Sequence, residues 1–169
     1  MADKSTFTPD EWKLLLQSVM VAGIAVTAAE PSGLWGMLKE GMASARALLQ
    51  AKTDPGANSL VSALVSDFET SEGITAAREG LQEKLKGSKP DEIKTKCIAV
   101  LRQTSDIVAS KAPEAATALK TWLYRISESV AEAAKEGGFL GFGGVKVSDV
   151  EKATLAEISA ALKLDQSST

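Results

Sequence analysis

Apolar residues recur every three or four positions along most of this chain, and this spacing is typical of one face of an α-helix. Clusters of Gly, Pro, Asp, Ser and Thr separate the periodic stretches and predict turns between helices. The seven helices predicted in this way span residues 9–30, 32–49, 59–68, 73–86, 90–110, 113–136 and 148–162. Apart from the short piece 145–147, no stretch alternates as a strand does. The sequence therefore predicts an all-α, single-domain helical bundle over residues 1–164, followed by a polar tail at 165–169.

The first predicted helix has the clearest start signals. Thr8 precedes Pro9 and lies three residues before Glu11, which is the pattern of a capping box with proline at the first helical position. Phe7 is placed to pack on Trp12 as a hydrophobic staple. We expect the apolar stripe that follows to face the core; it comprises Trp12, Leu15, Leu16, Val19, Gly23 and Val26.

The most apolar run covers residues 14–29 and includes Gln17, Ser18 and Thr27. Its 16 residues fall short of the roughly 20 that a membrane-spanning helix needs, which favours a buried core helix. A membrane-associating helical protein is the alternative that this run motivates, although we expect no membrane contact. The start of the chain lacks the basic region of a signal peptide, so we expect a cytoplasmic protein.

Composition excludes the commonest catalytic machinery. The chain has no histidine, so neither a Ser–His–Asp nor a Cys–His arrangement can form. Cys97 is the single cysteine and lies on an apolar helix stripe, which predicts a small buried hydrophobe and not a nucleophile. We therefore expect no enzyme activity; an enzyme that uses carboxylates or lysines alone is the alternative.

Charge argues against nucleic acid as a partner. The formal net charge is −3, which gives no global attraction to phosphate backbones. The locally basic stretch 78–102 is interrupted by acidic residues, and it contains no aromatic side chain on which a base could stack. We interpret it as a solvated helix face.

A glycine-rich connection at residues 137–144 carries three large apolar side chains, Phe139, Leu140 and Phe142. It lacks the Gly-Lys-Ser/Thr ending of a phosphate-binding loop. Two interpretations remain open. The three side chains fold back as a plug over the end of the bundle, or they dock a partner or touch lipid.

Two places in the sequence share an outline in which an Ala-rich helix ends at an acidic residue and a new helix with a Glu follows. Residues 26–33 read VTAAEPSG and are followed by Lys39-Glu40; residues 130–137 read VAEAAKEG, and residues 147–151 then read VSDVE. The second instance, over about 126–164, resembles the hairpin of the tellurite-resistance TerB family, with Leu155 and Ile158 at the matching helical spacing. The first instance, over 19–49, is similar more faintly.

The resemblance to TerB proteins implies an all-α fold with a weak pseudo-repeat of two helical hairpins. It also implies binding of a divalent metal such as Ca²⁺ or Mg²⁺, and a role in stress-related or membrane-linked assemblies. The residues that match the acidic positions are Glu30, Glu40, Glu136 and Glu151. This chain departs from the family in having Glu where the family has Asp at the hairpin corners, and Pro31 where the family has glycine.

The residues themselves do not decide whether these carboxylates bind a metal or only stabilise helix ends. Carboxylate oxygens suit Ca²⁺ and Mg²⁺, but Asp149 and Glu151 are also well placed to stabilise the start of a helix. Glu30 and Glu136 end helices, where negative charge is mildly unfavourable, so a separate role is easier to argue for them. The sequence thus predicts a non-enzymatic binding or assembly module, with a metal-binding stress protein as the alternative.

Overall fold

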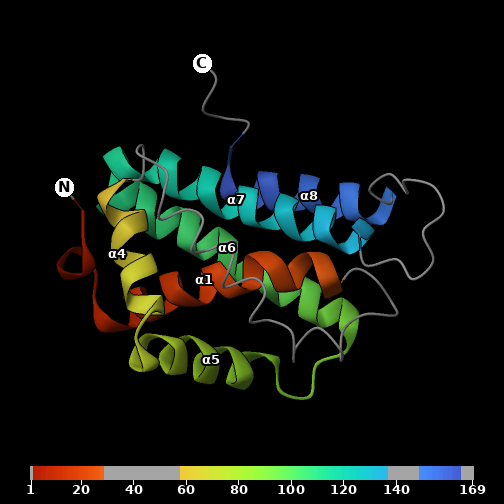
Figure 1. The fold of residues 1–169 in the computed structure, drawn as a ribbon, viewed down its shortest axis with the longest axis horizontal. Coiled ribbons are helices and arrows are strands. Elements are labelled where there is room, and N and C mark those ends of the chain that lie inside the picture. The colour runs from red at the N-terminus through yellow and green to blue at the C-terminus, as the bar shows by residue number, and fades with distance from the viewer. Residues whose placement is uncertain (1, 29–57, 137–148, 165–169) are drawn as a thin grey trace.

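The computed structural model describes residues 2–28, 58–136 and 149–164, and every regular element in these ranges is helical (Figure 1). A short 3₁₀ helix, η1, spans Lys4–Thr6. The α-helices are α1 (Pro9–Ala28), α4 (Ser59–Phe68), α5 (Ser71–Leu85), α6 (Pro90–Lys111), α7 (Pro113–Glu136) and α8 (Asp149–Leu162). The predicted all-α class is confirmed. The predicted helix over 32–49 lies outside the described residues, and so does the polar tail.

Helix α1 is the centre of the bundle. It contacts each of the other five α-helices of the described part, and Figure 1 shows α5 on one side of it with α7 and α8 on the other. Its predicted stripe is buried, from Trp12 to Val26. Six further residues of this helix are also buried, because neighbours surround it on several sides. The prediction of a core helix for this run is therefore confirmed.

Helix α1 also has the length and composition of a membrane span, alone among the helices of the described residues. About 67% of its most apolar window is buried inside the bundle, as for the core helix of a water-exposed domain. Length and apolar content by themselves therefore do not distinguish the two uses of such a helix.

The start of α1 has the predicted chemistry. The Thr8 amide donates to Glu11 Oε2 at 2.7 Å, and the Glu11 amide donates to Thr8 Oγ1 at 3.3 Å, which together make the capping box. The rings of Phe7 and Trp12 lie 6.0 Å apart, centroid to centroid, and both side chains are buried. The staple fixes the angle at which the chain enters the helix.

Helix α5 begins two residues before its predicted start at Gly73. The Thr70 side chain accepts a hydrogen bond from the Gly73 amide at 3.0 Å and so caps a helix whose first residue is Ser71. The pseudo-repeat of two hairpins stays a prediction, because much of the first hairpin lies outside the described residues.

Candidate functional site

Most of the predicted site residues lie outside the described part of the chain. Glu30 and Glu40 do so, and so do the interaction-loop residues Phe139, Leu140 and Phe142. Glu136 is the last residue of α7, and its side chain is likewise not described. Whether the four glutamates come together therefore stays a prediction.

Glu151 is the one predicted metal ligand whose side chain is described. It lies in the first turn of α8 and is only 5% exposed, although it is an ionisable residue. It takes part in an interaction within the structure. Among the described residues, no three Cys, Asp or Glu side chains lie together as a metal ion would require. A metal held by Glu151 would thus need ligands from outside these ranges.

Cys97 is fully buried on α6, as predicted. Burial raises the pKa of its thiol to about 12, because a thiolate would be poorly solvated there. The nucleophilic form is therefore suppressed at neutral pH, and the side chain acts as a small apolar group.

Buried serine hydroxyls make hydrogen bonds to backbone carbonyls. Ser127 of α7 donates to the Ala22 carbonyl of α1 at 2.8 Å. Ser105 of α6 donates to the Leu162 carbonyl at the end of α8 at 3.1 Å, and Ser18 donates within α1 to Leu15 at 2.6 Å. These groups join and stabilise helices, which leaves none of the three poised for nucleophilic attack.

A charged group on α6 and its neighbours was not anticipated from the sequence. Arg102 and Asp106 lie one turn apart on α6, Lys120 lies on α7, and Lys163 follows α8 directly. Lys163 Nζ donates to Asp106 Oδ1 at 2.5 Å. Its hydrogen bond lowers the pKa of Asp106, and so do the positive charges of Lys163, Lys120 and Arg102. Three cations thus act on one carboxylate.

Lys120 is the unusual member of this group, because it is only 8% exposed. It falls on the stripe of α7 whose other members, Ala116, Leu123, Ser127 and Ala131, are all buried. Burial and the neighbouring charge of Lys163 lower its pKa, and these effects outweigh the opposite effect of Asp106. In the sequence, Lys120 lies at a spacing of three or four residues from the nearest other members of this stripe. That spacing could have predicted its burial.

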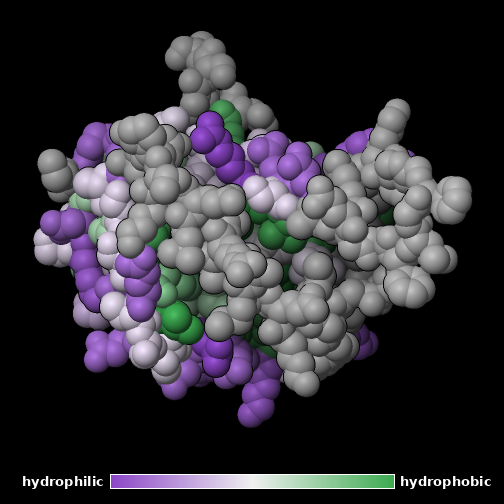
Figure 2. Space-filling view, in the orientation of Figure 1, coloured by the Kyte–Doolittle hydropathy of each residue, from purple (hydrophilic) through white to green (hydrophobic). Residues whose placement is uncertain are grey.

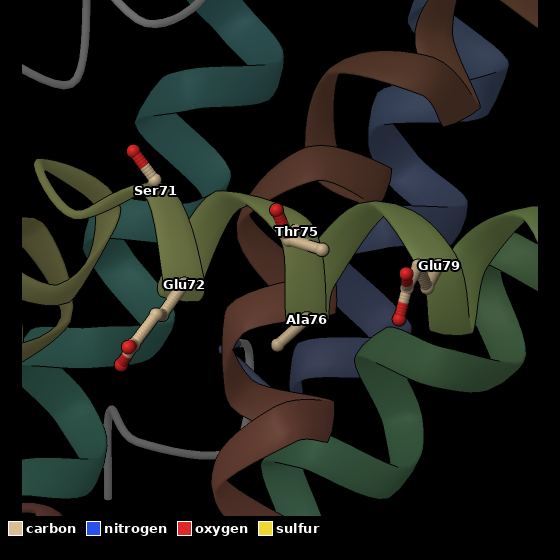
Figure 3. A pocket seen from close by; sticks show the side chains of 5 residues that line it. All are labelled: Ser71, Glu72, Thr75, Ala76 and Glu79. Carbon is tan, nitrogen blue, oxygen red and sulfur yellow. The ribbon is translucent and has the colours of Figure 1, made fainter.

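The outer face of α5 carries a shallow depression (Figure 3). Ser71, Glu72, Thr75, Ala76 and Glu79 line it. All five come from one helix, and four of them are exposed. The face presents polar groups to solvent without enclosing a volume that would exclude water.

Exposed apolar surface is scarce in the described part of the chain. Figure 2 shows hydrophilic residues around the rim of the face seen in Figure 1. Val150, at the start of α8, is 50% exposed and is the only large hydrophobic residue of the described ranges that is exposed. It follows closely after the predicted interaction loop in sequence.

Comparison with protein-family models, with curated proteins and with solved structures found no match. The resemblance to the TerB hairpin therefore stays a prediction from residues 126–164, and the function has to be argued from this chain alone.

Proposed function

We propose that this chain is a non-enzymatic helical module that binds a protein partner or a second copy of itself. In this proposal the helices have the two-hairpin arrangement of TerB proteins, and the module works in the cytoplasm. The apolar contact surface lies at the connection between α7 and α8, through Phe139, Leu140 and Phe142.

The observation that carries this proposal is the exposure of Val150. Val150 is 50% exposed at the N-terminal end of α8, whereas the other large hydrophobic residues of the described ranges are buried or half-buried. Val150 closely follows the apolar loop residues in sequence, and apolar groups gathered in one exposed patch are typical of contact sites. The hydrogen bonds of Ser18, Ser105 and Ser127 to backbone carbonyls, and the suppressed thiolate of Cys97, support a binding role over a catalytic one.

The test compares the intact chain with the double variant Phe139→Ser/Phe142→Ser and with Val150→Ser. Self-association is measured by sedimentation, and partners captured from the source cells are identified, purified and titrated one at a time. We expect both variants to fold and to lose at least about tenfold in affinity, as for apolar anchors at an interface. Glu72→Ser/Glu79→Ser on the exposed face of α5 is the matched control and should bind normally. Unchanged affinity in the Phe and Val variants would refute the proposal.

A divalent-metal site is the second candidate, and the burial of Glu151 is the observation that favours it. This residue is 5% exposed and lies in the first turn of α8, where the resemblance places a metal ligand. In this candidate, Ca²⁺ or Mg²⁺ is held by oxygen atoms of Glu151, Glu136, Glu30 and Glu40.

A further inference from the structure

Lysine side chains connect three helices at the end of α5. Lys96 of α6 reaches back over the turn, and its Nζ donates to the Lys84 carbonyl at 3.0 Å and to Ser88 Oγ at 2.7 Å. Lys84 Nζ in turn donates to Oε1 of Gln17 on α1 at 2.9 Å. Each of these acceptors is a neutral oxygen, so neither positive charge is neutralised there.

Lys13 of α1 joins the same place because Gly80 of α5 leaves room for it. A Cβ at Gly80 would lie 2.8 Å from Lys13 Cε and 2.1 Å from Gln17 Nε2, so both side chains of α1 lie against α5 at this glycine. Burial lowers the pKa of Lys84, and the nearby charge of Lys13 lowers it further. The stretch 78–102 by itself is typical of a solvated helix face, but the fold adds a lysine to it from a distant part of the chain.

The lysines that lack an ion pair gather at this place. Among the described side chains elsewhere, five lysines pair with Asp or Glu and Lys120 does not; the paired ones are Lys4, Lys94, Lys111, Lys152 and Lys163. Around the end of α5, five lysines form no ion pair with a described carboxylate. We call them the lysine junction; they are Lys13, Lys84 and Lys96, together with Lys86 and Lys89 of the exposed turn between α5 and α6. Unpaired positive charge is therefore concentrated at one end of α5.

Carboxylates near the turn do not cancel this charge. Glu92 Oε2 accepts a hydrogen bond from the Lys89 amide at 2.8 Å and so caps the start of α6. Glu83 and Asp91 are exposed on either side of the turn in the sequence. The five lysines outnumber these three carboxylates, although the formal net charge of the whole chain is −3.

We propose that the lysine junction is a docking surface for a short acidic segment of a protein partner. Carboxylates of such a segment supply the negative charge that the five lysines lack among the described residues. An extended anionic surface, such as a membrane or a nucleic-acid duplex, is disfavoured because it also meets the net negative charge of the rest of the chain. A short segment interacts mainly with charges within about 8 Å, the Debye length at physiological ionic strength. The lysine junction lies on other elements than the apolar contact surface of the proposed function and does not depend on it.

The test uses the full chain and a fluorescently labelled oligoglutamate peptide, with an oligoglutamine peptide of the same length as the neutral probe. Fluorescence anisotropy gives the affinity at low and at physiological ionic strength. We expect only the oligoglutamate to bind, and to bind more weakly as salt rises. Because Lys84 and Lys96 also hold the end of α5, the variant of choice is the exposed pair Lys86→Gln/Lys89→Gln. It should melt like the parent chain and weaken binding by about fivefold or more.

Lys152→Gln/Lys163→Gln is the matched control, because it removes the same charge from exposed side chains on α8 and directly after it. It should keep the parent affinity. Absence of oligoglutamate binding by the parent chain overturns the proposal. An equal loss of affinity in the control pair does so too, because it shows that only net charge matters. Vesicles of phosphatidylserine are the third probe, and cosedimentation with them in the absence of peptide binding would assign the surface to lipid instead.

Discussion

Trp12 of α1 donates its indole Nε1–H to Oδ2 of Asp67 in α4 at 2.6 Å. The same oxygen accepts a hydrogen bond from Lys4 Nζ at 2.9 Å, and Lys4 also lies 6.0 Å from the centre of the Trp12 ring. One carboxylate near the end of α4 thus holds the N-terminal segment and the first turn of the central helix.

Replacement of Asp67 by Ala should lower the free energy of unfolding by about 1–3 kcal/mol, because the buried Trp12 indole N–H loses its acceptor. Lys4→Ala should cost at most about 1 kcal/mol, because an exposed ion pair contributes little; the Lys4 side chain is 65% exposed. Urea unfolding of both variants measures the difference. Equal losses in the two variants would show that the indole bond is not the main contribution.

The same carboxylate predicts how stability depends on acid. Burial acts to raise the pKa of Asp67, but the hydrogen bonds from Lys4 and Trp12 outweigh it and hold the pKa below its ordinary value of 3.8. A group whose pKa is lowered by folding contributes stability that is complete above its unfolded pKa, and this contribution is lost as the pH falls through the folded pKa. We expect the bundle to lose stability below about pH 4. In Asp67→Asn, the Tm difference from the parent chain should shrink over that range.

Lys163 has a φ of 56°, in the left-handed region that favours glycine. It is the first residue after α8, and the hydrogen bonds from the Lys163 and Leu164 amides back to the Ala160 and Ser159 carbonyls form a Schellman motif. Lys163→Gly and Lys163→Ala both lose the ion pair with Asp106, but only glycine relieves the strain. The Gly variant should therefore be more stable than the Ala variant by about 1 kcal/mol in chemical denaturation. A more stable Ala variant would contradict the assigned backbone geometry.

Gly73 lies where α4 and α5 approach closely. A Cβ at this position would fall 2.1 Å from the Asp67 carbonyl oxygen, which is backbone and cannot rotate away. Gly73→Ala should therefore destabilise the chain by about 1–3 kcal/mol. At Gly80 the nearest atom is Nε2 of the Gln17 side chain, also at 2.1 Å. Because that side chain can move, Gly80→Ala should cost less, and thermal melts of the two variants compare them directly.

The metal hypothesis predicts that millimolar Ca²⁺ or Mg²⁺ raises Tm, because binding to the folded state stabilises it. Glu136→Ala and Glu151→Ala should each remove the shift. Glu157→Ala, on an exposed face of α8, is a control that should keep it. Absence of any shift in the parent chain at these ion concentrations would end the hypothesis.

The start of α1 shows how far local sequence reaches. The capping box of Thr8 and Glu11 and the packing of Phe7 on Trp12 join residues at most five positions apart. Side-chain chemistry and helix geometry fix such contacts without any other part of the fold. The burial of Cys97 was predictable for a related reason, since periodicity alone places it on an apolar face.

The contacts of the candidate site residues join distant parts of the chain, so they could not be predicted from local sequence. The acceptor of Trp12 is 55 positions away, and Lys163 follows the ion-pair partner Asp106 by 57. Periodicity states which face of a helix is apolar, but not which neighbour covers it. The sequence therefore determined an all-α bundle, the start of α1 and the apolar stripes through interactions over a few residues. The packing of α6, α7 and α8 decided that Lys120 is largely buried and close enough to Lys163 and Asp106 to feel their charges, because helix pairing sets the contacts between distant residues.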